Sequence, residues 1–308
     1  LKMNNIAIHI CTRDRPTEVS LLLQSLRTQT YKRFNVLILD DGGGAPVTNY
    51  YFVNYIINRM KLEGNDVKII RNQFPSGVSK ARQQLVDYHL KERKEELILR
   101  LDDDVICDED YIEELVKGID SGYDLMSGLT VPLAGPDNIR ALPKDEQIMG
   151  ECELNDKGEL ILNKDMCGGL WTNNKIYLTP HFRSCALYKR KIHEEGVDYK
   201  SRLSNNGFRE EQILSFKMIL KGFKLGVNTN AINYHLMTPS GGERDTMNMG
   251  AFNQNILDET VKKMFEEHGD FIKAYYTKHN VIPLIKTKGD YLKGDNLVQV
   301  KQDINLLK

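Results

Sequence analysis

Glu96-Leu97-Ile98-Leu99-Arg100-Leu101-Asp102-Asp103-Asp104 is the stretch that decides the fold. Its first six residues form a mostly apolar run, which is typical of a strand buried on both faces of a parallel sheet. The run ends in three adjacent carboxylates. Ligands of open α/β sheets bind beyond the carboxyl ends of the strands. The sequence therefore predicts a ligand site directly after Leu101.

Three further apolar runs precede this one, and we predict that they form strands at 6–11, 34–39 and 67–70. Helical patterns separate them, beginning near Thr17, spanning about 48–62, and beginning again at Ser76. This alternation of strand and helix predicts a doubly wound, mostly parallel sheet. Thr12 and Asp41 also follow strand ends, so we expect one cleft to receive Thr12, Asp41 and Asp104.

The pattern changes after residue 107. We predict helices at 109–117, 207–222 and 253–268, a terminal strand at 223–233, and an irregular region at 121–182 with short antiparallel strands. Met237 to Gly242 has the composition of a mobile loop. We expect three parts: a nucleotide-binding half at 1–107, an acceptor-binding half of the same domain at 108–250, and a C-terminal helical extension at 251–308.

The overall composition is that of an ordinary globular protein. The 308 residues are 41% hydrophobic and 28% charged. Lys and Arg number 42 against 43 Asp and Glu, a net charge of −1. A nucleic-acid binder usually has a basic excess, so no nucleic-acid partner is expected. The oligomeric state is left open.

The sequence offers no apolar run approaching the roughly 20 residues that span a bilayer, so no transmembrane segment or signal peptide is expected. The five cysteines are odd in number and lack CxxC spacing. This argues against a zinc cluster or a disulfide framework and favours reduced thiols. We therefore predict a cytoplasmic location and leave peripheral attachment to a membrane open.

Three adjacent carboxylates need a physical explanation. Packed side by side they repel each other, and burial raises their pKa values. Hard cations such as Mn²⁺ and Mg²⁺ prefer oxygen ligands and commonly bridge carboxylates to substrate phosphates. The alternative is a solvated acidic loop before the next helix, where Asp is also favoured. The position at a strand end favours the metal site.

A series of short motifs extends this pattern along the chain. In order they are Ile6 to Thr12, Gln29-Thr30-Tyr31-Lys32-Arg33-Phe34, Leu39-Asp40-Asp41-Gly42, Gly77-Val78-Ser79-Lys80-Ala81-Arg82, Leu101 to Asp104, Gly207-Phe208-Arg209-Glu210-Glu211-Gln212, and Tyr234-His235. In content, order and approximate spacing the series resembles the family 2 glycosyltransferases of the GT-A fold. The resemblance covers roughly residues 5–237, and the D-x-D motif alone would be weak.

The resemblance implies a metal-dependent hexosyltransferase that acts in glycan or polysaccharide biosynthesis. Its donor would be a nucleotide-diphosphate sugar, most simply a UDP-sugar, with Mn²⁺ or Mg²⁺ as cofactor. Its acceptor would be a hydroxyl of a glycan, a lipid-linked molecule or another compound. The family pattern implies inversion at the anomeric carbon, although retaining enzymes use the same fold.

The resemblance also implies donor and metal ligands. Asp41 would read the imide of a uracil or thymine, with an Asx turn as its structural alternative. Asp104 would coordinate the metal, and Asp102 would face the ribose or the metal shell. Asp103 could replace either, since a triplet leaves the register open. The remaining candidates are Thr12 and Asp14 in the nucleoside pocket, Lys80 and Arg82 near the uridine or diphosphate, and His235 at the metal.

Glu211 is the candidate catalytic base, since a carboxylate can take the proton from an acceptor hydroxyl. Glu210 is the alternative, because the family often has Glu-Asp where this chain has Glu-Glu. Both could instead be exposed acids that favour a helix start. Trp171 and Arg183 are candidate acceptor contacts, and Arg244 could reach the diphosphate when its loop closes.

Two other functions fit parts of the pattern. A sugar nucleotidyltransferase would carry a glycine-rich loop after the first strand, where this chain has Thr12-Arg13-Asp14-Arg15-Pro16. A non-catalytic nucleotide-sugar or glycan-binding module could keep Asp41 and Asp104 but would not need Glu211.

Overall fold

The computed structural model describes residues 6–133, 184–199 and 210–242. It also describes the short segments 151–154, 160–163, 176–179, 181–182, 263, 266–268 and 285–287. The predicted acceptor contacts Trp171 and Arg183, Arg244, and most of the predicted helix 253–268 lie outside the described residues.

The first hundred residues fold as the sequence predicts, into alternating strands and helices. Pro16 starts the first helix, where its fixed φ and missing N–H are tolerated. The elements are β1 (Ile6–Thr12), α1 (Pro16–Arg27), β2 (Phe34–Asp40), the short 3₁₀ turn η1 (Val47–Asn49), α2 (Tyr51–Leu62), β3 (Val67–Arg71), α3 (Val78–Glu92) and β4 (Leu97–Asp102).

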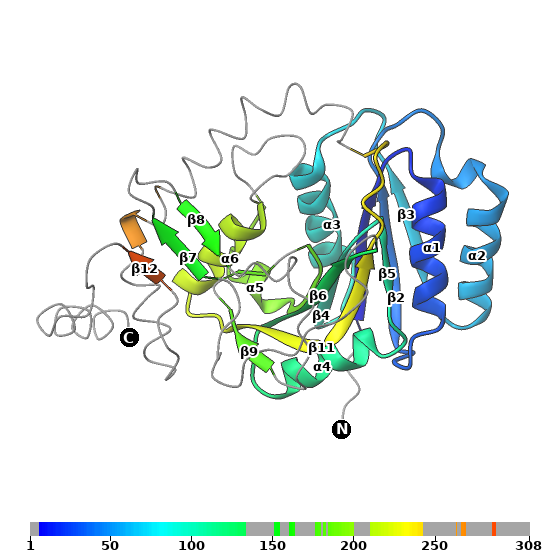
Figure 1. Ribbon diagram of the computed structural model, residues 1–308. Helices are drawn as coiled ribbons and strands as arrows, with labels where there is room; N and C mark the ends of the chain where they lie inside the picture. The colour runs from blue at the N-terminus through cyan, green and yellow to red at the C-terminus, as the bar shows by residue number, and fades with distance from the viewer. Residues whose placement is uncertain are drawn as a thin grey trace, which may run out of the picture.

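The second half adds strands to the far edge of the same sheet. Its elements are β5 (Val105–Cys107), α4 (Tyr111–Asp120), β6 (Leu125–Pro132), β9 (Ile176–Leu178), β10 (Ala186–Lys189), α5 (Lys191–Glu194), α6 (Glu210–Leu220) and β11 (Leu225–His235). The strand order is β3-β2-β1-β4-β10-β6-β11-β5, with β9 paired to β11 (Figure 1). Pairing is parallel from β3 to β4 and between β6 and β11, and antiparallel at β10, β5 and β9. The predicted α/β fold with a mostly parallel sheet is confirmed.

Strand β6 corrects the prediction that residues 121–182 are irregular. It runs through the middle of the sheet, between β10 and β11. The sequence pattern does not indicate β6, because Ser127, Gly128 and Thr130 interrupt the apolar run. The structure explains the glycine: a Cβ on Gly128 would lie 2.2 Å from the carbonyl oxygen of Ala231 in β11. Close approach of the two strands requires a residue without a side chain there.

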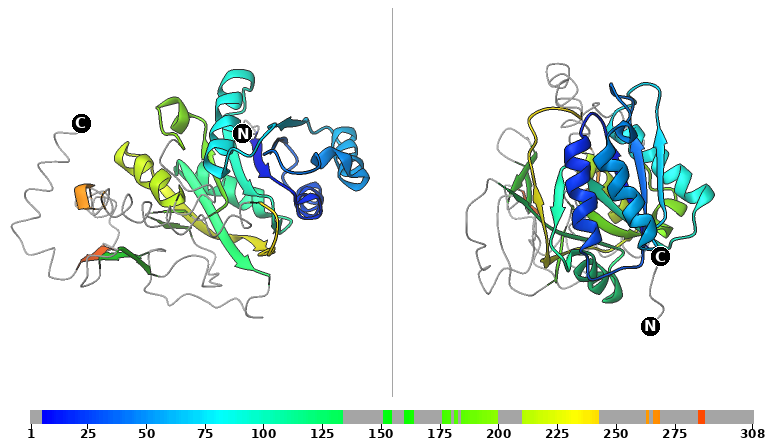
Figure 2. Two further views of the ribbon diagram at one scale, coloured as in Figure 1. Left: turned by 90° about the horizontal axis from the view of Figure 1, so that it is seen from above. Right: turned by 90° about the vertical axis from the view of Figure 1, so that its right-hand side faces the viewer.

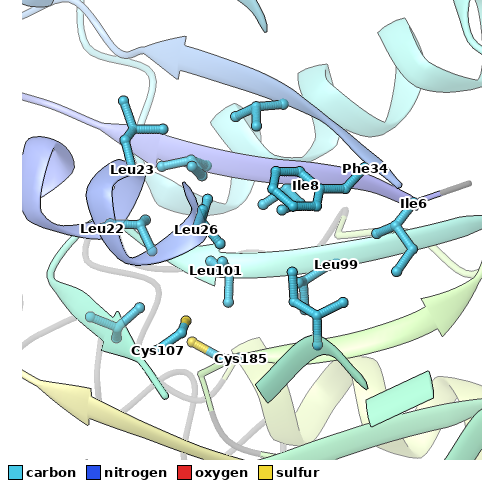
Figure 3. Close-up of a cluster of buried hydrophobic side chains, with 14 of the residues drawn as sticks. Ile6, Ile8, Leu22, Leu23, Leu26, Phe34, Leu99, Leu101, Cys107 and Cys185 are labelled. Atoms are coloured by element: carbon cyan, nitrogen blue, oxygen red, sulfur yellow. The ribbon is translucent and has the colours of Figure 1, made fainter. Parts of the chain in front are cut away.

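The two faces of the sheet are covered by different helices. Alternate β4 residues Leu97, Leu99 and Leu101 join the core under α1 and α4. Figure 3 shows Leu22, Leu23 and Leu26 of α1 together with Leu101 in this core. Ile98 joins the core that α6 covers on the opposite face. Figure 2 shows α1 and α2 side by side on one face. Arg100 and Asp102 share the Ile98 face, so their charged ends project toward α3 and α6.

The C-terminal extension contributes more than helix. Residues 266–268 are helical, but β12 (Ile285–Thr287) pairs in parallel with β7 (Glu151–Leu154). With β8 (Leu160–Asn163) these strands form a second, three-stranded sheet. Within the described part of the chain, no helix combines the length and the apolar character needed to cross a membrane.

Candidate active site

Strand register brings the predicted site residues to one edge of the sheet. Thr12 is level with Asp40 on β2, and its neighbour Cys11 is level with Asp102 on β4. The amide of Asp41 donates to the carbonyl of Thr12 at 2.8 Å. The expectation that these strand ends converge therefore holds for the backbone, while the carboxylates that follow them point in different directions.

Asp102 faces α3 and β10. Its Oδ1 accepts a hydrogen bond from Arg82 Nη2 at 2.6 Å, and its Oδ2 accepts one from the Ser184 hydroxyl. Burial by itself would raise the pKa of Asp102, but Arg82 and Ser184 hold that pKa below its usual value. Asp102 is thus held between Arg82 on α3 and Ser184, two residues before β10.

Asp103 faces the loop between β1 and α1. Thr12 Oγ1 donates to its Oδ2 at 2.8 Å, and Arg15 Nη1 donates to its Oδ1 at 2.9 Å. Burial nevertheless raises the pKa of Asp103 to about 6, because Arg15 and Thr12 offset only part of the desolvation. Asp103 therefore ties the end of β4 to the polar loop after β1.

Asp104 lies between that loop and the end of β11. Its Oδ2 is 3.2 Å from Arg15 Nη1, and its Oδ1 is 3.2 Å from His235 Nε2. The amide of Leu236 donates to the backbone carbonyl of Asp104 at 2.8 Å, which fixes β11 beside the triplet. Protein groups separate and neutralise the three carboxylates, so mutual repulsion alone does not require a metal ion.

Asp104 and His235 are the side chains that fit a divalent cation. A nearly buried carboxylate and an imidazole nitrogen at 3.2 Å offer the oxygen and nitrogen donors that such ions accept. In the part of the chain that the structure describes, no cluster of three or more His, Cys, Asp or Glu could hold a metal. A metal here would take its other ligands from phosphate and water, as Mg²⁺ commonly does.

Asp41 is buried beneath the loop that leads into α3. Both its carboxylate oxygens accept from the amide of Ser76, and one also accepts from the amide of Gly77, each at 3.0 Å. Asn72 Nδ2 and the Ser76 hydroxyl add bonds of 2.7 Å. In this arrangement Asp41 holds the start of α3 at the end of β2, which is the structural alternative considered for it.

Asp14 has a related role in the glycine turn after β2. Its backbone is left-handed, with φ of 54°, and its Oδ1 accepts from the amide of Gly44 at 2.8 Å. A Cβ on Gly43 would lie 2.2 Å from that carboxylate oxygen, so a side chain at this position would force the Asp14 carboxylate to move. Lys80 is exposed on α3 and has no recorded contact with these groups among the described residues.

Glu210 and Glu211 begin α6 and meet two arginines. Arg82 Nε lies 2.9 Å from Glu210 Oε1, and Arg100 Nη2 donates to Glu210 at 2.7 Å and to Glu211 at 2.8 Å. Ser79 Oγ adds a bond of 3.0 Å to Glu210 Oε2. The Glu210 side chain is 2% exposed and that of Glu211 is 20% exposed. Burial raises the pKa of both carboxyls, and the charge of Glu210 raises that of Glu211 further.

The segment 238–242 is anchored to the β1–α1 loop. Arg15 Nε donates to the carbonyl of Ser240 at 3.1 Å, and the amide of Gly242 donates to the carbonyl of Arg13 at 2.8 Å. Gly241 and Gly242 both have positive φ, and a Cβ on Gly241 would lie 2.8 Å from Arg15 Cγ. Arg15, which binds the acid triplet, thus anchors Ser240, and the backbone of Arg13 anchors Gly242, in the segment that the sequence predicts to be mobile.

A comparison of the sequence with known families decides the class of protein. The family described as Glycosyl transferase family 2 matches residues 7–197, which is well over half of the chain. The chain belongs to this glycosyltransferase family. It is therefore a transferase enzyme, and the resemblance inferred from the motifs is confirmed. A search of curated proteins finds no match.

Solved structures share the fold of this glycosyltransferase at low sequence identity. GalNAc-T7, solved with UDP, GalNAc and Mn²⁺, is 16% identical with a TM-score of 0.64, covering 98% of this chain and 55% of that one. TarS from S. aureus is 15% identical at a TM-score of 0.52, covering 86% and 43%. Its residues 1–349, solved with UDP-GlcNAc, are 14% identical at 0.58, covering 97% and 80%. The chain thus spans about half of GalNAc-T7 and less than half of TarS.

The structure adds side chains of this glycosyltransferase that sequence reasoning missed. Arg15, Arg100 and Ser79 each bind an acid of the triplet or of the Glu210–Glu211 pair. Arg100 had a detectable signal: it is a charged residue inside an apolar strand, where arginine is rarely found unless paired. Ser79 had no such signal, because serine is common at turns and helix starts.

Proposed function

We propose that this family 2 glycosyltransferase transfers a sugar from a UDP-sugar donor to an acceptor hydroxyl, with inversion at the anomeric carbon and Glu211 as the base. The observation that carries the proposal is the contrast within the acid pair. Glu210 is enclosed by Arg82, Arg100 and Ser79, whereas Glu211 shares only Arg100 with it and reaches the surface.

A general base must contact the hydroxyl whose proton it takes. The 20% exposure of Glu211 allows such contact, and the 2% exposure of Glu210 does not. The raised pKa of Glu211 strengthens its carboxylate as a base, because a base works best with a pKa near the working pH. We therefore assign the proton transfer to Glu211 and a fixed, anchoring role to Glu210.

The donor would lie across the strand ends. The amide and carbonyl groups beyond β1 and β2, with Thr12, Asp14 and Asp41, form the edge where ligands of α/β sheets bind. Asp41 would have to exchange part of its bonding to Ser76 and Asn72 to read a uracil imide. UDP as the nucleotide is supported by the solved structures of GalNAc-T7 and TarS, which contain UDP and UDP-GlcNAc.

A divalent metal, Mn²⁺ or Mg²⁺, would be held by Asp104 and His235. When bound, such an ion neutralises charge that develops on the leaving diphosphate. Arg15 already contacts Asp104 and would be displaced from it or share it. Asp102 remains the candidate for the ribose or a water of the metal shell, with Arg82 holding it ionised. Asp103 would support the site from the side of Thr12.

The acceptor is a hydroxyl of a glycan, a lipid-linked molecule or another compound. Trp171 and Arg183 remain candidate contacts for it.

A donor screen tests this function. Purified protein with Mn²⁺ is incubated with UDP-, GDP- and dTDP-sugars, and slow donor hydrolysis and thermal stabilisation are measured. Stabilisation and hydrolysis with UDP-sugars are expected. The Glu211→Gln variant should lose hydrolysis and keep the stabilisation, whereas a binding module would show no hydrolysis in either form. A response to GDP-sugars alone would contradict the uracil assignment.

A further inference from the structure

Arg100 is a charged side chain at the centre of the sheet. It lies on β4, level with His9 of β1 and Ala186 of β10, and it is among the largest fully buried side chains, 2% exposed. Arginine is almost never buried to this extent unless it is paired, because the guanidinium loses its hydration. Arg100 has no role in the proposed reaction as described above.

The acid pair explains why Arg100 is there. One nitrogen, Nη2, donates to Glu210 at 2.7 Å and to Glu211 at 2.8 Å. Glu210 has further partners in Arg82 and Ser79. Among the described residues, Arg100 is the only side chain recorded as donating to the Glu211 carboxylate. Glu210 would keep its place without Arg100, and Glu211 would not.

The rest of the Arg100 side chain is fixed by packing. Its guanidinium carbon lies 5.3 Å from the ring centre of Phe182 and 5.8 Å from that of Tyr199. Nε and Nη1 have no partner among the described residues. They border a small cavity that Arg100 lines together with His9, Cys11, Arg82, Leu85, Tyr188 and Tyr199. Polar groups around this cavity suit an internal water, which would satisfy the free nitrogens.

We propose that Arg100 is a positioning residue, whose Nη2 holds the Glu211 carboxylate in the part-exposed orientation that reaches the acceptor hydroxyl. Glu210 is held in place by Arg82 and Ser79. Because Arg100 binds both carboxylates, this fixed Glu210 also fixes the guanidinium that holds Glu211. This inference rests on the proposed function, because it concerns the orientation of the proposed base. Arg100 acts through Glu211 and touches neither donor nor acceptor.

The test compares Arg100→Gln and Arg100→Lys with the wild-type chain. The readout is hydrolysis of the UDP-sugar that the wild type hydrolyses fastest, with Mn²⁺ present. A misplaced base lowers kcat and leaves donor binding intact, so kcat should fall roughly 10- to 100-fold for Arg100→Gln with the donor KM within about twofold. Arg100→Lys should have a higher kcat than Arg100→Gln, because lysine retains the positive charge although it lacks the planar guanidinium that can bind two carboxylates.

A double-mutant cycle separates positioning from general damage to the fold. If Arg100 acts only through Glu211, Arg100→Gln causes no further loss in a Glu211→Gln background. An equal loss in both backgrounds would show that Arg100 only supports the fold and would overturn the inference. Arg93→Gln is the matched control: Arg93 pairs with Glu95 and Asp66 away from the site, and its loss should leave kcat unchanged.

Crystal structures of the Arg100 variants test the inference without activity. The Glu211 carboxylate should leave its position in Arg100→Gln, while Glu210 stays with Arg82 and Ser79. An unmoved Glu211 would contradict the inference. If Arg100→Gln does not fold, the same comparison is made with Arg100→Lys. Full activity of Glu211→Gln would instead remove the proposed function, so the two failures are distinct.

Discussion

The two acidic clusters of this glycosyltransferase, Asp102 to Asp104 and Glu210–Glu211, have their neighbouring negative charges neutralised in different ways. In the triplet, Asp102 pairs with Arg82 on α3. Asp103 and Asp104 share Arg15 of the β1–α1 loop, and each also has a partner of its own, Thr12 for Asp103 and His235 for Asp104. The pair Glu210–Glu211 shares the single cation Arg100. Asp102 is therefore separated from the other two acids of the triplet by an arginine of its own, whereas Glu210 and Glu211 are coupled through one guanidinium nitrogen.

The difference indicates where substrate groups can enter. Asp102 and Asp103 are held by arginine and hydroxyl donors, and Asp104 also faces an imidazole that can bind metal. In the pair, Glu210 is closed in and Glu211 is open. We therefore propose that each cluster offers one carboxylate for chemistry, Asp104 in the triplet and Glu211 in the pair. The following experiments test that division.

The largest effect is expected at Glu211. Glu211→Gln removes the base and should lower the rate of transfer or donor hydrolysis by about 10²- to 10⁴-fold. Steady-state kinetics measure it, with UDP stabilisation as a check on donor binding. Glu210→Gln is the comparison: it should lower stability more and leave the base in place. If Glu210→Gln abolishes turnover while Glu211→Gln does not, the two roles are exchanged.

Buried histidines also make the stability of the protein depend on pH, and this effect must be distinguished from that of the two acidic clusters. Burial lowers the pKa of His193 from 6.5 to about 4, so its folded form stays neutral while the unfolded form binds a proton. The stability it contributes is present above about pH 6.5 and is lost as the pH falls toward 4, up to about 3 kcal/mol. Thermal unfolding of wild type and His193→Gln from pH 8 to 4 measures this. Parallel pH profiles would refute the buried neutral histidine.

A metal should depend on Asp104 more than on Asp102. Asp104→Asn should weaken Mn²⁺-dependent stabilisation by UDP by roughly 10- to 100-fold in Mn²⁺ concentration, since it removes the charged oxygen beside His235. Asp102→Asn is the matched variant, because the wild-type Asp102 carboxylate faces Arg82 and Ser184. It should weaken the Mn²⁺-dependent stabilisation less than Asp104→Asn does. Titration of Mn²⁺ in thermal-shift experiments distinguishes them. A larger loss for Asp102→Asn would place the metal on the other side of the triplet.

The smallest effect concerns Asp41. Asp41→Asn keeps one acceptor oxygen for the amides of Ser76 and Gly77 and should cost about 1–2 kcal/mol of unfolding free energy. If Asp41 also reads the uracil imide, the same variant should lose its preference for UDP over GDP. Calorimetry with both nucleotides measures this. An unchanged preference would leave Asp41 with its structural role alone.

Much of the first half could be predicted from local pattern. Short apolar runs followed by polar turns indicate β1 to β4, and Pro16 and the glycines at 42–44 mark where the chain turns. Strand β6 could not be predicted in this way, because Gly128 is required by the approach of Ala231, which lies far away in the sequence. Its apolar pattern is interrupted by a contact that only the folded chain contains.

The candidate site, too, has features that the sequence determined and others that only the folded structure determined. The sequence by itself determined the family, the parallel sheet and the acids at its edge, because strand periodicity and motif order are local properties. Only the tertiary structure decided which carboxylate each arginine binds, that Asp102 and Asp104 face opposite ways, and that Glu211 is open while Glu210 is closed. The physical reason is that charge pairing and burial depend on distances between segments that the sequence separates by up to about 130 residues.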